Sequence, residues 1–326
     1  MAQARRHAGL ADVTGTVAIT DEGWYRFLYE HPELREVNFW RPSARASFNA
    51  PEFSPFFFKL RALHNNAICG FAFFAHFSRL PDWLAWDLFE IGNGCPSFEE
   101  LHTRIADLRA GIRYNEATGS EDIGCIELVS PVFFAPDAWI PGPSDWHPRT
   151  QVPMAYDLTD GEGKRIWEAC MSRLSTLPTS GPEFPLSAVV SPIARYGDPR
   201  PVRARLGQAT FRSSVLDAYG RACAVTSEHS LPALEASHIR PFAEDGPHEV
   251  SNGLLLRADL HRLFDTGYVT VTPDLRLEVS RLLRDQYHNG RSYYPLDGTT
   301  LRPPEVVRYR PDPELLRWHN DNKFRQ

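Results

Sequence analysis

The order of apolar and polar residues predicts strands in the first half of the chain. Two aromatic runs, Pro55–Leu60 and Ala67–Phe77, are separated by the turn residues His64–Asn66, and this arrangement is typical of a hairpin. A further buried strand is predicted over Ile123–Val129, which is mostly apolar and β-branched. These segments indicate a sheet with an aromatic core.

Two helices are predicted among these strands. A short one covers Asp21–Tyr29. A longer one covers Ser97–Ile112, because Ser97 is followed three positions later by Glu100, which is a helix-start signal, and apolar residues then recur at helical spacing. The first half is therefore predicted to be mixed α and β.

The second half mixes the two kinds of element in short succession. The predicted elements are a helix over Phe211–Tyr219 that Thr210 caps and Gly220 ends, a strand over Ala233–Ile239, a turn at Asn252–Gly253, a helix over Leu254–Phe264 that Gly267 ends, and a closing hairpin of Tyr268–Val271 and Leu275–Val279. His238 lies near the end of the predicted strand. On the second helix His261 and Asp265 are four residues apart, so both can point the same way as a ligand pair. The whole chain is predicted to be α+β.

A proline-rich segment divides the two halves. Too many prolines fall between Met171 and Pro201 for a helix or a central strand, namely Pro178, Pro182, Pro185, Pro192, Pro199 and Pro201. A length of 326 residues also favours two domains. We therefore expect an N-terminal domain over residues 1–175, a linker over 176–200 and a C-terminal domain over 201–326.

Composition and charge narrow the class of protein. The longest apolar run, Ile68–Phe77, is too short to span a membrane, and no signal peptide is recognisable, so a cytoplasmic location is expected. Five scattered cysteines without a C-x-x-C pair favour buried thiols over disulfides or a zinc site. Residues 1–180 hold 16 Lys and Arg against 23 Asp and Glu, whereas residues 181–326 hold 19 against 18. The arginine-rich second half is the better candidate for phosphate binding.

The order His238, Asn252, His261 on strand, loop and helix resembles the ββα-metal motif of HNH endonucleases. The surrounding text, including ACAVTSEHSLP, LEASHIRP and NGLLLRADLHRLFDTG, is similar to the restriction-type branch of that family. The resemblance covers about residues 200–326. It implies a ββα-metal nuclease domain that hydrolyses DNA phosphodiesters.

The resemblance also implies roles for individual residues. His238 would be the general base, because a neutral imidazole accepts a proton near pH 7, and Asn252 would fix the loop that orients it. His261 is at the family's metal-ligand position, and Asp265 is where some members place a further ligand. The expected metal is Mg²⁺, with Mn²⁺, Ni²⁺ or Zn²⁺ left open by the imidazole ligand.

Three arginines are candidates for DNA contacts, and two further histidines are expected at the surface and not in catalysis. Arg240 and Arg257 flank the motif, and Arg212 belongs to the basic segment before it. His229 and His248 lie in predicted loops, and the sequence favours surface positions for both. The N-terminal half contributes none of these residues.

One position departs from the family pattern. Many HNH enzymes carry Asp or His immediately before the base, where this chain has Ser237, with Glu235 two residues earlier. Three alternatives remain open: His261 and Asp265 hold the metal with water, Glu235 reaches inward, or the site is weakened. Regular strand alternation places Glu235 and Ser237 on one face and His238 on the other. The cysteine pairs that bind structural zinc in some relatives are absent, so no structural zinc is expected.

The first half resembles the PUA-like group of base-reading domains, which implies a mixed α/β domain with a PUA-like β-barrel. The resemblance rests on NFWRPS, FFFKL, AICGFAFF, LPDWLAW, the GNG of residues 92–94 and IGCIEL. Large aromatics often simply fill a core. The alternative is an aromatic pocket for an unstacked base, and the best candidates for its walls are Trp40, Trp83 and Trp86.

These patterns predict a metal-dependent DNA endonuclease, a restriction enzyme that its N-terminal domain directs to DNA carrying modified cytosine. A homodimer is an option, because one HNH centre cuts one strand. Two alternatives stay open. One is a DNA-binding protein with a decayed, inactive HNH fold, and the other is an aromatic domain that recognises protein or RNA.

Overall fold

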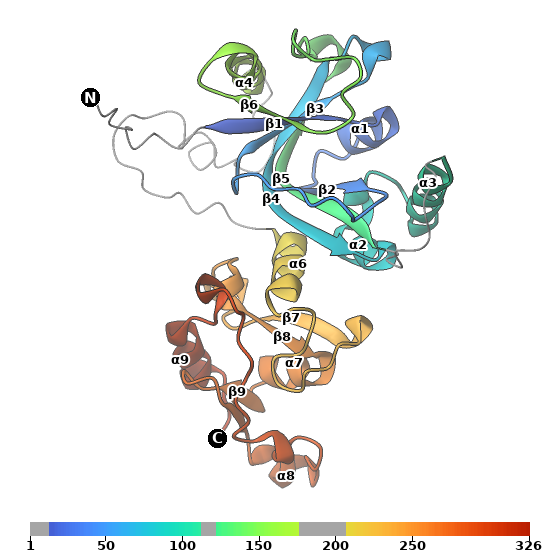
Figure 1. The fold of residues 1–326 in the computed structure, drawn as a ribbon. Helices are drawn as coiled ribbons and strands as arrows, with labels where there is room; N and C mark the ends of the chain where they lie inside the picture. Colours follow the sequence, from blue (N-terminus) through green and yellow to red (C-terminus); the bar gives the residue numbers. More distant parts are fainter. Residues whose placement is uncertain (1–12, 112–121, 176–206) are drawn as a thin grey trace, which may run out of the picture. The chain divides into compact units, whose positions relative to one another are not determined.

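The computed structural model describes residues 13–111, 122–175 and 207–326. They belong to two compact units, Met1–Ala204 and Arg205–Gln326 (Figure 1). The predicted linker over 176–200 lies outside the described residues.

A six-stranded sheet is the centre of the N-terminal unit (Figure 1). Its strands are β1 (Thr14–Ile19), β2 (Glu36–Arg41), β3 (Pro55–Lys59), β4 (Ile68–Leu80), β5 (Ile123–Phe133) and β6 (Met154–Asp157). Their order is β2-β5-β4-β3-β1-β6, with β1 and β3 parallel and every other pair antiparallel. The predicted β3–β4 hairpin is confirmed, and the turn residues Asn65 and Asn66 take the left-handed backbone conformation.

The N-terminal unit also carries four described helices. They are α1 (Glu22–Tyr29), α2 (Asp82–Phe89), α3 (Phe98–Gly111) and α4 (Gly161–Leu174). Helix α1 begins where the Asp21 carboxylate accepts a hydrogen bond from the Trp24 amide, and α3 begins where the Ser97 hydroxyl accepts one from the Glu100 amide. Both predicted helices are confirmed within a residue or two.

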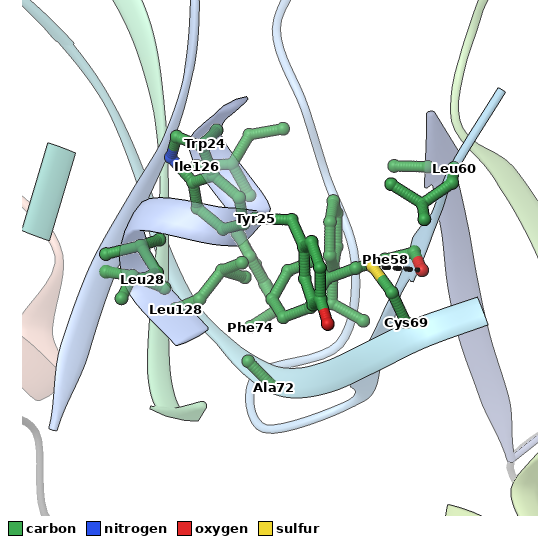
Figure 2. Close-up of a cluster of buried hydrophobic side chains, with 13 residues drawn as sticks. Trp24, Tyr25, Leu28, Phe58, Leu60, Cys69, Ala72, Phe74, Ile126 and Leu128 are labelled. Carbon is green, nitrogen blue, oxygen red and sulfur yellow. Dashed lines mark hydrogen bonds between the residues drawn. The ribbon is translucent and has the colours of Figure 1, made fainter. Parts of the chain in front are cut away.

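Aromatic side chains fill both faces of this sheet. Figure 2 shows Trp24, Tyr25 and Leu28 of α1 packed among side chains of β3, β4 and β5, including Phe58 and Leu128. On the opposite face the Trp167 ring of α4 lies 5.9 Å to 6.4 Å from the rings of Phe57, Phe71 and Phe73. Strand alternation separates the two sets, so α1 and α4 cover opposite faces.

The C-terminal unit is built of short elements. They are α6 (Gln208–Ala218), β7 (Leu234–His238), β8 (Gly253–Arg257), α7 (Ala258–Asp265), β9 (Val269–Val271), β10 (Leu277–Val279), α8 (Leu282–Tyr287) and α9 (Pro313–Asn322). The predicted β9–β10 hairpin and the strand that ends in His238 are confirmed. The expected mixture of α and β structure is therefore found in both units.

Two predicted helix boundaries in this unit are wrong. Leu254, Leu255 and Leu256 were expected to begin a helix, but they form β8 and are buried on both sides of a two-stranded ribbon with β7. Three consecutive leucines fit either a buried strand or a buried helix, and pairing with β7 decides in favour of the strand. Helix α6 begins at Gln208, so Thr210 lies inside the helix and does not cap it.

All five cysteines are buried free thiols, as expected. Among the described residues, no helix is both long enough and apolar enough to cross a membrane.

Candidate active site

Strands β7 and β8 with helix α7 form a ββα unit that carries the motif residues. His238 ends β7 and pairs with Gly253, the first residue of β8. A Cβ at Gly253 would lie 2.5 Å from the Val215 side chain and 3.1 Å from the Phe211 ring. The missing side chain therefore lets helix α6 pack directly against the end of β7 where His238 lies.

The His238 imidazole is held by aromatic neighbours. It stacks on Phe211 with ring centroids 3.9 Å apart and planes at 11°, and the His248 ring meets its edge at 5.3 Å. Its buried Nε2 atom has no hydrogen-bond partner. Burial, with a smaller contribution from the charge of His248, lowers the pKa of His238 to about 4. The imidazole is therefore neutral at pH 7, with a nitrogen free to accept a proton.

The Asn252 side chain forms hydrogen bonds to the backbone of the segment that follows His238. Its side-chain oxygen accepts a hydrogen bond from the Arg240 amide at 2.9 Å, and its amide nitrogen donates to the carbonyl oxygens of Arg240 (2.9 Å) and Pro247 (2.8 Å). Its own carbonyl accepts from the Ile239 amide at 2.8 Å. Because Asn252 is fully buried, these bonds exclude water and fix the chain directly after His238.

His261 lies between two carboxylates. Its Nδ1 atom is 2.6 Å from a Glu235 carboxylate oxygen, and its Nε2 atom is 3.2 Å from an Asp265 carboxylate oxygen. Burial lowers the pKa of His261, but the bonds to the two carboxylates outweigh burial and raise it overall. The expected alignment of His261 with Asp265 on one face of α7 is found.

Glu235 and His238 line the same cavity although β7 pairs with β8 in regular register, which keeps the expected alternation of the strand. The Glu235 side chain is long and half-exposed, so its carboxylate reaches α7. Ser237 is fully buried and outside the set of cavity-lining residues.

A cavity of about 920 Å³ in the C-terminal unit joins these groups. It is lined by Gly207, Gln208, Arg212, Glu235, Ala236, His238, Ile239, Pro241, Phe242, His248, His261, Asp265, His319 and Lys323. The general-base candidate and the carboxylate-flanked imidazole therefore face one space. The charged lining residues are Arg212, Lys323, Glu235 and Asp265, and Lys323 pairs with the Glu244 carboxylate.

The three arginine candidates have different surroundings. Arg212 lines the cavity. Arg257 instead forms two hydrogen bonds of 2.7 Å with the Asp259 carboxylate, which neutralises its charge locally. The Arg240 guanidinium lies 5.2 Å above the Trp318 ring. Neither Arg240 nor Arg257 is among the lining residues, so the structure brings only Arg212 of the three to the cavity.

Sequence reasoning missed three residues of the cavity wall. His248 was expected at the surface, but it packs beside His238; His229 is exposed, as expected. His319 and Lys323 come from α9, far along the chain from the motif. No local pattern marks these two, because only the packing of α9 brings them to the wall.

Acid pH is expected to destabilise the C-terminal unit through His319. This side chain is 2% exposed, stacks on Phe264 at 3.7 Å and donates from Nε2 to the Phe264 carbonyl. Burial lowers its pKa from 6.5 to about 4, although the Phe264 carbonyl and the nearby Asp265 act in the opposite direction. The unfolded chain therefore binds this proton first, so its contribution to stability is complete above pH 6.5 and is lost as pH falls towards 4.

We expect a loss of about 3 kcal/mol in the free energy of unfolding between pH 7 and pH 4 from this residue. Urea unfolding at several pH values measures it. His319→Gln should flatten that part of the profile, and an unchanged profile would contradict the assignment.

In the N-terminal unit, the three indoles proposed as pocket walls lie on neighbouring elements. Trp40 is on β2, and its indole N–H donates to the Asn93 carbonyl at 3.0 Å. Trp83 and Trp86 are on α2, where Trp83 is 37% exposed. The Asn93 side chain donates to the Ala85 carbonyl of α2 and so connects the two elements. No ring contact among residues 13–111 and 122–175 joins these indoles directly.

The motif is confirmed by comparison with known proteins. Residues 223–272 match the family model described as HNH endonuclease, so the C-terminal unit contains an HNH endonuclease domain. None of the curated proteins matches the chain.

Solved structures give partial matches. One described as a modification-dependent TagI restriction endonuclease is 26% identical to this chain, with a TM-score of 0.28 over 38% of this chain and 39% of that chain. ASCH from Zymomonas mobilis is 12% identical, with a TM-score of 0.30 over 48% of this chain and 94% of that chain, and a mutant of it matches similarly. The N-terminal half is the part that resembles these ASCH domains. The chain spans well under half the length of the matched restriction endonuclease.

Proposed function

We propose that this protein is a metal-dependent endonuclease that hydrolyses DNA phosphodiesters at the cavity of its C-terminal unit. The observation that carries the proposal is the unpartnered, neutral His238 imidazole in the same cavity as the His261–Asp265 pair. A proton acceptor and a ligand pair in one cavity are groups that phosphodiester hydrolysis needs.

His238 accepts the proton of the attacking water. The imidazole is neutral, and the stack on Phe211 and the Asn252 bonds fix the ring and the chain after it. A phosphodiester in the cavity favours the imidazolium form and so raises the pKa of His238 from its low value. Arg212, which lines the cavity, is the proposed contact to the phosphate.

The residues present fit a divalent cation held by few protein ligands. His261 Nε2 and the Asp265 carboxylate oxygen, 3.2 Å apart, are spaced as two adjacent ligands of one ion, and Glu235 engages the other ring nitrogen. Among the described residues, no group of three or more His, Cys, Asp or Glu is placed to hold an ion together. Such a pair suits Mg²⁺, which keeps several waters, and admits Mn²⁺, Ni²⁺ or Zn²⁺. When bound, the cation would neutralise charge on the scissile phosphate and the leaving oxygen.

Glu235 is expected to orient His261 rather than to replace Ser237 as a direct ligand. A carboxylate that accepts a hydrogen bond from Nδ1–H would leave Nε2 as the ring nitrogen that holds the cation. Glu235→Ala should weaken Mn²⁺ binding roughly 10- to 100-fold, and Glu235→Gln should retain part of the affinity because its amide oxygen still accepts that bond. Titration calorimetry without DNA measures both.

The matched control is Glu278→Gln, an exposed glutamate on β10 of the same unit. It should bind Mn²⁺ like the unaltered chain. Unchanged affinity in Glu235→Ala would remove Glu235 from the site.

The N-terminal unit is proposed to direct cleavage to modified cytosine. Trp40, Trp83 and Trp86 are all partly or substantially exposed, and Asn93 links the elements that carry them. Exposed indoles on adjoining elements provide planar surfaces for an extruded base. Such a domain needs few phosphate contacts, which agrees with its acidic balance.

The test is cleavage of matched DNA duplexes containing cytosine, 5-methylcytosine, 5-hydroxymethylcytosine or glucosylated 5-hydroxymethylcytosine, with Mg²⁺, Mn²⁺ or Ni²⁺. Cutting confined to one modified duplex is expected. Equal cutting of all duplexes would discard the base-reading role and keep the nuclease. DNA binding without cutting under any metal would favour a DNA-binding protein with an inactive HNH fold.

A further inference from the structure

Two arginines of the N-terminal unit flank a glycine in the middle of three strands. Arg41 on β2 and Arg79 on β4 both pair in register with Gly124 of the intervening strand β5. Residues in register across neighbouring strands point to the same face of a sheet. Both arginine side chains therefore leave the sheet on one face. The Phe77 ring covers Gly124 on that face, since a Cβ there would lie 3.3 Å from the ring and 3.4 Å from the Arg41 Nε atom.

The two guanidinium groups are held in place. Arg41 donates from Nη2 to the Ala46 carbonyl at 2.5 Å, and Arg79 donates from Nε to the Ala44 carbonyl at 2.8 Å. Both guanidiniums lie over the half-buried Phe77 ring, at 5.2 Å and 5.5 Å from its centroid. Fixed side chains lose little conformational entropy when they bind a ligand.

The charge of this pair is uncompensated. Within residues 13–111 and 122–175, neither guanidinium forms an ion pair, whereas Arg26, Arg104 and Arg165 of the same unit each pair with a carboxylate. The Nε atom of Arg41 is buried without a hydrogen-bond partner. Burial, and to a smaller extent the charge of Arg79, lowers the pKa of Arg41. An anion bound by both groups would offset their repulsion.

We propose that Arg41 and Arg79 form a phosphate-binding site through which the N-terminal unit contacts the backbone of the DNA substrate. Guanidinium forks match phosphate oxygens, and two positive groups on one face suit a polyanion in an otherwise acidic unit. The inference rests on the proposed function, and it adds a DNA contact that is separate from the C-terminal cavity. Arg41 and Arg79 hold the backbone without reading its sequence.

The test uses the full chain with His238→Ala and no divalent metal, so that DNA is bound without being cut. Fluorescence anisotropy with one DNA duplex, repeated over a salt series, compares Arg41→Gln/Arg79→Gln with Arg26→Gln/Lys164→Gln. The control pair removes the same charge from exposed helix positions whose cations pair with carboxylates of their own helices. Affinity should fall roughly tenfold in the first variant, and its slope of log affinity against log salt should drop by about 2, while the control changes little.

Other outcomes would overturn the proposal. Equal losses of DNA affinity in both double variants would show that only net charge matters. An unchanged salt slope in Arg41→Gln/Arg79→Gln would show that these two arginines do not bind phosphate. A larger loss with an RNA duplex than with DNA would reassign the surface to RNA. Arg79→Gln alone changes an exposed position and should leave the fold intact. It should lower the slope of log affinity against log salt by about 1. Metal-dependent cleavage by the chain with His238 intact tests the proposed function separately.

Discussion

Replacing His238 with alanine should slow DNA cleavage by roughly a thousandfold and leave DNA binding in place. The expectation follows from the neutral His238 imidazole, which lines the cavity and has a nitrogen without a hydrogen-bond partner, while Arg212 remains in the cavity wall. Single-turnover cleavage with saturating metal measures the chemical step, and anisotropy without metal measures binding.

Two further variants make the His238 result specific. His238→Gln preserves a polar side chain of similar reach but no base, so it should be as inactive as alanine. His229→Ala removes an exposed histidine that only contacts the Arg221 carbonyl, and it should cleave normally. If His238→Ala kept more than about a tenth of the rate, another group would be the base.

Replacing Asn252 with alanine should lower the free energy of unfolding of the C-terminal unit by about 3 kcal/mol. The change deletes three side-chain hydrogen bonds at a fully buried position and leaves the Arg240 amide and two carbonyls unpaired. Cleavage should fall as well, because the segment after His238 is released. Scanning calorimetry gives the stability, and amide hydrogen exchange across β7 and β8 locates the loss.

Asn322→Ala is the matched control for this loss of stability. Asn322 is exposed near the end of α9 and makes one side-chain bond, to the Trp318 carbonyl. Its replacement should change stability by less than about 0.5 kcal/mol. Similar stabilities for Asn252→Ala and Asn322→Ala would contradict a stabilising role of the Asn252 hydrogen bonds. A destabilised Asn252→Ala that still cleaves at the full rate would show that these bonds are not needed for catalysis.

Short sequence patterns correctly predicted the helix starts and the turn that are set by residues a few positions apart in the chain. Ser97 and Asp21 mark helix starts because a cap acts within three residues, and Asn65–Asn66 marks a turn because these residues tolerate a left-handed backbone. The four-residue spacing of His261 and Asp265 was enough to align them on α7. The same local view failed at Leu254–Leu256, where only pairing with β7 distinguishes strand from helix.

The sequence by itself determined the α+β class, the HNH motif and the identity of its base candidate, since each depends on residue type and short spacing. Only the tertiary structure decided that Glu235 engages His261 and that α9 supplies His319 and Lys323 to the cavity. It also decided that Arg41 and Arg79 meet across Gly124. These contacts join segments far apart in the chain, and packing and strand register bring them together by interactions that no short stretch of sequence contains.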